Sequence, residues 1–209
     1  MRQSRVAAAV GNIRSVSPRL ALFAYGSLVS LASAERTLGR SVTDVHAVRL
    51  PGWRRRWSLA RDNIRSEKTF ARRDGSIPPH CLGLNIEPGA VGPEPNGALY
   101  EVTAGELDRL AAREIRYDRV EVTDALDQAV REQFDRAFTF TAKPENFAPS
   151  PPPGAVILAS YVLAVQAAFE ALGPRELEAF RKSTGQCPVD VVEATLVRDR
   201  IPSGNPREW

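Results

Sequence analysis

Glu114 is the residue whose position in the sequence best suits acid–base chemistry. In one predicted helix the apolar positions are Leu107, Leu110 and Ala111, which form the i, i+3, i+4 stripe of a single face. The next position of that stripe, i+7, is Glu114. Burial disfavours the charged form of a carboxyl group and raises its pKa toward neutrality, as a general acid and base requires. A second interpretation stays open, in which Glu114 lies at a frayed helix end and pairs with a neighbouring arginine.

A short apolar strand that breaks at a glycine and a serine is the second such feature. The run from Leu20 to Tyr25 ends abruptly at Gly26 and Ser27. Glycine lets the backbone approach a ligand closely, and successive N–H groups in such a corner bind anions such as a free carboxylate. The alternative is an ordinary structural turn, because a strand followed by Gly-Ser occurs in many folds.

Ser27 also raises the question of a serine hydrolase. The nucleophile elbow of such enzymes has glycines two positions before and two positions after the serine. Tyr25 and Val29 occupy those positions here. We therefore interpret Ser27 as a ligand-contacting or turn residue rather than a nucleophile.

Metal and cofactor sites are not predicted. Cys81 and Cys187 stand far apart in the chain, and His46 and His80 are the only histidines. This is too small a set for a His/Cys metal cluster, and the cysteines do not have the spacing of a disulfide framework. No P-loop is present either. We expect an activity that needs no metal and no cofactor.

The run Trp53-Arg54-Arg55-Arg56-Trp57 suggests nucleic-acid binding, since arginine and aromatic side chains combine phosphate contacts with base stacking. On a strand, however, Trp53, Arg55 and Trp57 share one face, so the run equally describes a half-buried strand with a basic edge. No recognised nucleic-acid module accompanies it, and we expect no nucleic-acid partner.

Basic residues outnumber acidic ones by ten in residues 1–80, and acidic residues outnumber basic ones by seven in residues 81–209. We interpret the arginine excess chiefly as solvated surface. As a hypothesis, the arginines of residues 61–73 attract an anionic substrate.

The elements that must position these residues follow from periodicity and turn residues. Strands are expected at 20–25, 45–50, 53–59, 81–86, 98–102, 117–123, 138–140 and 155–158, and helices at 33–38, 104–115, 160–172 and 174–182. Thr103 and Glu106 have capping-box spacing, which marks a helix start. The polar, arginine-rich residues 61–79 are expected to form a long loop. Strands outnumber helices without strict alternation, which predicts an α+β fold: a compact mixed β-barrel or sheet with flanking helices.

Length and composition fit one globular domain. The 209 residues are 43% hydrophobic and 25% charged, which excludes wholesale disorder. We expect a loose N-terminal arm over residues 1–19 and a single domain over 20–209. The longest uncharged stretch, 154–169, is shorter than a bilayer span, and no secretory signal is recognised. We therefore expect a soluble, cytoplasmic protein without a membrane partner.

Several motifs in order resemble the γ-glutamylcyclotransferase-like family. They are the YGSL motif at residues 25–28, Gly-Ala-Leu-Tyr-Glu-Val at 97–102, the leucine-containing helix that ends in Arg113-Glu114, and Tyr-Asp-Arg-Val at 117–120. The resemblance covers roughly residues 20–172 and implies a compact mixed barrel with flanking helices. Residues 61–80 and the segment before Leu20 match nothing in the family, so the resemblance leaves the substrate's leaving group open. The sequence also leaves the oligomeric state open.

The resemblance also implies roles for particular residues. Carried over position by position, the glutamyl-binding backbone corresponds to Tyr25, Gly26, Ser27 and Leu28, the acid/base glutamate to Glu114, and a pocket-lining tyrosine to Tyr161. The implied activity is intramolecular attack of an α-amine on the γ-carbonyl of a small-molecule γ-glutamyl substrate. It yields 5-oxoproline and a free amine or amino acid, a reaction of glutathione metabolism. The competing hypothesis is a non-catalytic binding or interaction protein of the same fold.

Overall fold

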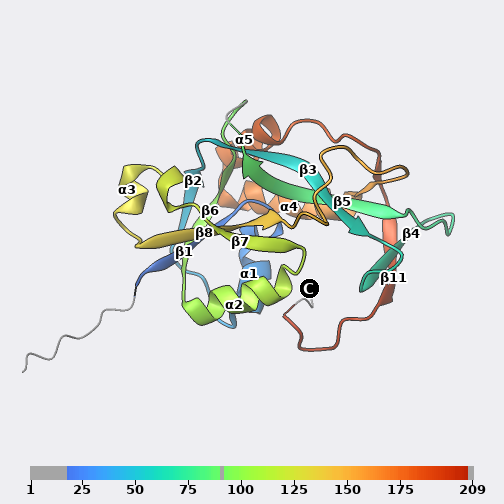
Figure 1. The fold of residues 1–209 in the computed structure, drawn as a ribbon, viewed down its shortest axis with the longest axis horizontal. Coiled ribbons are helices and arrows are strands. Elements are labelled where there is room, and N and C mark those ends of the chain that lie inside the picture. Colours follow the sequence, from blue (N-terminus) through green and yellow to red (C-terminus); the bar gives the residue numbers. More distant parts are fainter. Residues whose placement is uncertain (1–17, 90–91, 207–209) are drawn as a thin grey trace, which may run out of the picture.

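A five-stranded mixed sheet forms the centre of the molecule. In the computed structural model, which describes residues 18–89 and 92–206, its strands lie in the order β2 (Val45–Arg49), β6 (Asn96–Val102), β1 (Leu20–Ala24), β8 (Arg136–Ala142) and β7 (Tyr117–Glu121). The central strand β1 pairs antiparallel with β6 and parallel with β8. All five residues of β1 are buried, so the strand that leads into the YGSL motif is held on both edges and both faces (Figure 1).

Six further strands form two-stranded sheets. They are β3 (Trp53–Asp62) with β5 (His80–Pro88), β4 (Lys68–Arg72) with β11 (Ala194–Asp199), and β9 (Ile157–Leu158) with β10 (Val191–Val192). The long ribbon of β3 and β5 packs against β8. It carries β4 and β11 at the end of the molecule opposite α3 (Gln128–Arg131) (Figure 1).

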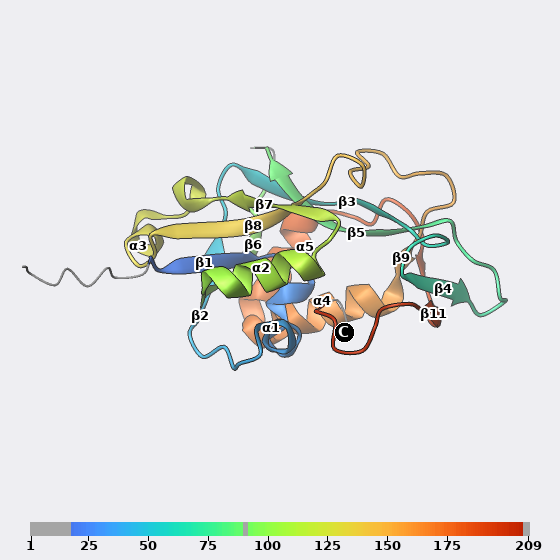
Figure 2. The same cartoon turned by 60° about the horizontal axis from the view of Figure 1, so that its bottom comes forward.

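The helices are α1 (Leu31–Leu38), α2 (Ala104–Arg113), α4 (Ala159–Leu172), α5 (Pro174–Thr184) and the short α3, with two 3-10 turns, η1 (Ser27–Val29) and η2 (Thr123–Ala125). Figure 2 shows α1 and α4 on the same side of the central sheet. α4 packs against η1, and α1 packs against α2. The YGSL corner and the end of α2 are therefore held by helices from distant parts of the chain.

The predicted capping box of α2 is confirmed. The Glu106 N–H donates to Thr103 Oγ1 (3.2 Å), and the Thr103 N–H donates to Glu106 Oε2 (2.8 Å). Arg40 Nε also donates to Glu106 Oε1 at 2.6 Å. Because a capping box fixes the first turn, it also sets the register that places Glu114 as the C-cap residue of the same helix.

Gly97 allows β6 and β1 to approach closely at the corner. A Cβ atom at this position would lie 2.2 Å from Ala24 O and 2.8 Å from the Phe23 ring. Only glycine fits where two backbones come this near.

The predicted α+β class is confirmed: a mixed sheet with flanking helices. Among the described residues the strands form an open sheet and three ribbons rather than a closed barrel. The division into an arm over 1–19 and a domain over 20–209 stays a prediction, since the arm lies almost entirely outside the described residues. No helix in the ranges 18–89 and 92–206 is long and apolar enough to cross a bilayer.

The loop predicted for residues 61–79 is wrong, because the segment contains β4. β4 pairs with β11, more than 120 positions further along the chain. The buried side chain of Asn63 also orders the segment, since it donates to Phe70 O and Pro78 O and accepts from the Phe70 N–H. Pairing with a distant strand outweighed the polar local composition.

Candidate active site

β1 ends in a tight corner that leads into η1. The Val29 N–H donates to Gly26 O (3.0 Å), and the Ser30 N–H donates to Ser27 O (3.2 Å). As at the start of any helix, the N–H groups before the first such bond have no partner within the turn. The Tyr161 hydroxyl lies 3.4 Å from the place that a Cβ atom on residue 26 would occupy. The corner therefore presents bare backbone to the space beside Tyr161.

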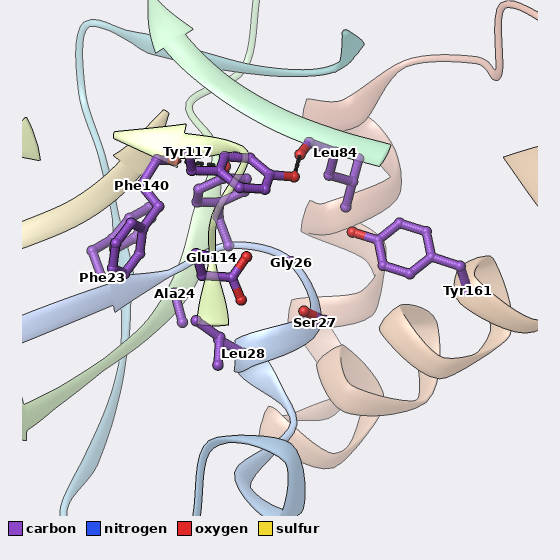
Figure 3. A pocket seen from close by; sticks show the side chains of 11 residues that line it. Phe23, Ala24, Gly26, Ser27, Leu28, Leu84, Glu114, Tyr117, Phe140 and Tyr161 are labelled. Carbon is purple, nitrogen blue, oxygen red and sulfur yellow. Dashed lines mark hydrogen bonds between the residues drawn. The ribbon is translucent and has the colours of Figure 1, made fainter. Parts of the chain in front are cut away.

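A small pocket of about 40 Å³ opens at this corner. Its lining includes all of the predicted site residues: Tyr25, Gly26, Ser27, Leu28, Glu114 and Tyr161. They come from β1 with η1, from the end of α2 and from α4. In Figure 3 the Glu114 carboxylate points toward the side of the pocket formed by Gly26 and Ser27. The structure brings these residues together, and their chemical roles stay predictions.

Glu114 combines the two situations that the sequence left open. As the C-cap residue it follows the last turn of α2, with its N–H donating to Leu110 O at 2.8 Å. Its side chain is only 17% exposed, and Arg113 Nε lies 3.3 Å from Glu114 Oε1. Burial raises the pKa of Glu114 by more than Arg113 and Arg116 lower it. The carboxyl group is therefore both buried and paired, with a net pKa above the ordinary value.

Arg113 is fixed by the neighbouring helix. Its guanidinium donates to Ser33 O (2.7 Å), Ser33 Oγ (2.7 Å) and Thr37 Oγ1 (2.8 Å) on α1. Only 7% of the residue is exposed. Because these bonds hold the guanidinium, they fix the positive charge beside Glu114, which limits how far burial raises the carboxyl pKa.

Three tyrosines line the pocket, and the sequence predicts only Tyr25 and Tyr161 there. Tyr25 donates its hydroxyl to Phe140 O and Tyr117 donates its hydroxyl to Leu84 O, both at 2.7 Å. Burial raises the pKa of Tyr25, Tyr117 and Tyr161, so all three phenols stay neutral at physiological pH. Tyr117 begins the strand that follows Glu114, and that closeness was the signal that could have placed it in the site.

Behind the corner lies a buried arginine for which the sequence predicts only a half-buried strand. Arg55 is 1% exposed and stacks on the rings of Phe169 and Phe180. Its five N–H groups all donate, to Tyr25 O (3.1 Å), Asn96 O (2.7 Å), Asn96 Oδ1 (2.8 Å), Ser183 Oγ (2.8 Å) and Thr184 Oγ1 (2.8 Å). The interpretation of the arginine excess as chiefly solvated surface is therefore wrong for Arg55. The reason is that complete hydrogen bonding makes burial of the charge tolerable.

A larger cavity of about 390 Å³ adjoins the small pocket and shares Ser27, Glu114, Tyr117 and Tyr161 with it. Arg116 and Glu67 form a two-pronged ion pair in its wall, with Nη1 to Oε1 at 2.9 Å. Burial opposes ionisation of Glu67, but the bond from Arg116, a backbone hydrogen bond and the charges of Arg116 and Arg61 together outweigh it and hold the Glu67 pKa at about 2. Glu67 is therefore ionised at neutral pH and Glu114 remains the carboxyl group of raised pKa.

No group of three or more His, Cys, Asp or Glu side chains with the geometry of a metal site occurs within residues 18–89 and 92–206. Cys81 is buried and Cys187 is exposed, and both are free thiols.

Comparison with known proteins defines the fold. No protein-family model matches the chain, and no curated protein sequence matches it. A solved structure described as gamma-glutamyl cyclotransferase is 13% identical, with a TM-score of 0.52 over 84% of this chain and 94% of that chain. An uncharacterized protein from Homo sapiens, loc79017, is 15% identical, with a TM-score of 0.52 over 85% and 95% of the two chains.

YkqA from Bacillus subtilis is 18% identical, also with a TM-score of 0.52. The match covers 82% of this chain and 56% of YkqA. At such identities the likeness is one of fold. The chain has the γ-glutamylcyclotransferase-like α+β fold, and its chemistry has to follow from its own residues.

Proposed function

We propose that the protein is a γ-glutamylcyclotransferase-type enzyme that converts a γ-glutamyl compound to 5-oxoproline and a free amine or amino acid. One observation carries the proposal. A carboxyl group of raised pKa, Glu114, faces the backbone corner of Gly26 and Ser27 inside one pocket. The γ-glutamyl cyclotransferase fold is consistent with it. The proposed partner is thus a small molecule, and the proposed location is the cytoplasm, as part of glutathione metabolism.

In this mechanism the pocket holds the glutamyl part in a folded conformation. Backbone N–H groups at residues 26–28 bind its carboxylate, and the neutral tyrosines exclude water around the rest. The α-amine and the γ-carbonyl then meet in one five-membered ring. Holding reactants in such geometry contributes roughly 7 to 11 kcal/mol in favourable cases.

Glu114 performs the proton transfers. The α-amine arrives as an ammonium ion, and the Glu114 carboxylate takes one of its protons. The amine nitrogen attacks the γ-carbon, the original amide C–N bond breaks, and Glu114 gives its proton to the departing amine. The ring nitrogen then loses its second proton to Glu114, which passes it to the released amine, so that the amine leaves as an ammonium ion. A carboxyl group of ordinary pKa would be a weaker base for the first step, so the raised pKa suits this exchange.

The test is release of 5-oxoproline from γ-glutamyl amino acids, glutathione and γ-glutamylamines. We expect wild type to release it from at least one compound and Glu114→Gln to release almost none. Glu145→Gln, on an exposed loop outside both cavities, is the matched control and should behave like wild type.

Equal inactivity of wild type and Glu114→Gln on the whole panel would contradict the proposal. If calorimetry then detected binding of the same compounds, the non-catalytic binding protein of the same fold would be the better description.

A further inference from the structure

The larger cavity lies where the leaving group of such a reaction must go. The small pocket, at about 40 Å³, has room for only a few atoms beyond its lining. The cavity of about 390 Å³ meets it at Ser27, Glu114, Tyr117 and Tyr161. A γ-glutamyl group held at the corner would therefore extend its amide substituent past Glu114 into the larger space.

The charges in the cavity wall do not balance. Four arginines and two glutamates line it: Arg36, Arg61, Arg113, Arg116, Glu67 and Glu114. Arg116 is paired with Glu67 and Arg113 with Glu114. No carboxylate in the described part of the chain lies within ion-pair distance of Arg61 or Arg36. The wall thus carries two positive charges more than negative ones, although the Arg61 charge also helps to lower the pKa of Glu67.

Arg61 is held in place by neutral partners. Its guanidinium donates to Lys68 O (2.7 Å), Asn63 Oδ1 (3.1 Å) and Ser66 Oγ (3.4 Å), and it lies over the Phe70 ring at 5.1 Å. These contacts fix its direction without neutralising its charge. Arg36, on α1, is exposed and reaches the cavity from a different element. Two cations from separate walls suit an anion that lies between them.

The rest of the wall is largely apolar and contains Leu59, Phe70, Leu82, Ile115, Leu158 and Ala164. A bare inorganic ion would leave this surface uncovered. A group with an apolar side chain and a carboxylate would satisfy both parts of the wall.

Resting on the proposed function, we propose that this cavity is a leaving-group subsite for amines that carry a carboxylate, and that Arg61, assisted by Arg36, binds that carboxylate. The substrates are then γ-glutamyl amino acids or short γ-glutamyl peptides, and simple γ-glutamylamines react poorly. The arginine-rich segment thus contributes a defined contact inside the site.

The experiment compares γ-glutamyl-alanine with γ-glutamyl-alaninamide, which differ only in the terminal carboxylate. Alaninamide is the less basic amine and so chemically the better leaving group. A preference for the acid would therefore show that the protein recognises the terminal carboxylate. We expect wild type to favour the acid by about 30-fold or more in kcat/KM. Arg61→Met should remove most of that preference by raising KM for the acid, with the amide within about threefold of wild type.

Arg36→Met keeps all of the hydrogen bonds described for Arg61, so it tests the subsite without disturbing β4. We expect it to lower the preference by about threefold to tenfold. Arg175→Met, on an exposed position of α5 outside the cavity, is the matched control and should leave both substrates unchanged. Melting temperatures of all variants identify any loss of folding.

Equal wild-type kcat/KM for acid and amide would overturn the proposal, as would an equal loss of both substrates in a folded Arg61→Met protein. If neither compound yields 5-oxoproline, the proposed function fails and calorimetry of the same two compounds decides about the subsite. Tighter binding of the acid, lost in Arg61→Met, supports the subsite alone, and equal binding refutes it.

Discussion

The two hollows on either side of Glu114 are built differently. In the corner pocket, the Tyr25 and Tyr117 hydroxyls both donate to backbone carbonyls, and Arg55 supports the corner from behind with all five donors used. In the larger cavity, Arg61 and Arg36 have no carboxylate partner among the described residues. Polar groups whose hydrogen bonds are all made within the protein keep the shape of a site fixed, whereas charges without a nearby opposite charge are available to bind a ligand. Under the proposed function, the corner would therefore perform the chemistry and the cavity would select the substrate.

The substitution Glu114→Gln should have the largest effect and should separate the roles of the two regions most clearly. We expect kcat to fall by about a thousandfold on γ-glutamyl-alanine and its amide alike, since general acid–base catalysis contributes roughly 10² to 10⁴. Arg61→Met, in contrast, should act on one substrate and through KM. A Glu114→Gln protein that lost only affinity, with kcat retained, would remove the distinction.

The support behind the corner is tested by Arg55→Met. This change removes the donors to Tyr25 O and Asn96 O in the interior, so we expect the free energy of unfolding to fall by about 3 kcal/mol or more. Arg54→Met is the matched control, because Arg54 lies on the other face of β3 with a side chain 40% exposed and paired with Glu87. Its loss should cost under about 1 kcal/mol. Urea unfolding measures both, and equal costs would mean that Arg55 does not support the corner.

The close contact of the corner with β6 is tested by Gly97→Ala. The added methyl group would meet Ala24 O at 2.2 Å, so we expect a loss of about 1 to 3 kcal/mol from overpacking. Gly105→Ala, on α2 with nothing within 4 Å of its Cβ position, should instead stabilise by about 0.5 to 1 kcal/mol. If Gly97→Ala melted at a higher temperature than Gly105→Ala, the corner would accommodate the added methyl group without strain.

The pH dependence is the smallest effect expected and the most specific to Glu114. Burial raises its pKa in the folded state, so the folded protein holds this proton more tightly than the unfolded chain. The stability from this group is therefore present below the ordinary glutamate pKa and is lost as pH rises through the raised value.

Over the same interval kcat/KM should rise, because the base form is the active one. Wild type should thus lose stability relative to Glu114→Gln while it gains activity. Unfolding free energies of both proteins across mildly acidic to neutral pH test this. A constant difference between them would indicate a Glu114 carboxyl group without a raised pKa.

Local signals in the sequence predicted much of the corner. The strand that stops at Gly26 and the capping box of Thr103 and Glu106 depend on interactions within a few residues, and both are present. The stripe that ends at Glu114 follows from helix geometry, and the sequence left burial of that carboxyl group and pairing with a neighbouring arginine as alternatives, which the structure combines. The resemblance to the γ-glutamylcyclotransferase-like family rests on the same short motifs.

The larger cavity was not predictable in this way. β4 exists because it pairs with β11 from the far end of the chain, and its own polar composition indicates a loop. Arg55 is buried because Ser183 and Thr184, 128 and 129 positions away, complete its hydrogen bonds.

The amino-acid sequence alone therefore determined the backbone corner, the helix that ends at Glu114 and the α+β class, since short-range preferences decide each of them. Only the tertiary structure decided which arginines are buried, which have no carboxylate within ion-pair distance and how large a cavity adjoins the corner. Those properties depend on contacts between segments that are distant in the sequence, and local sequence patterns do not predict such contacts.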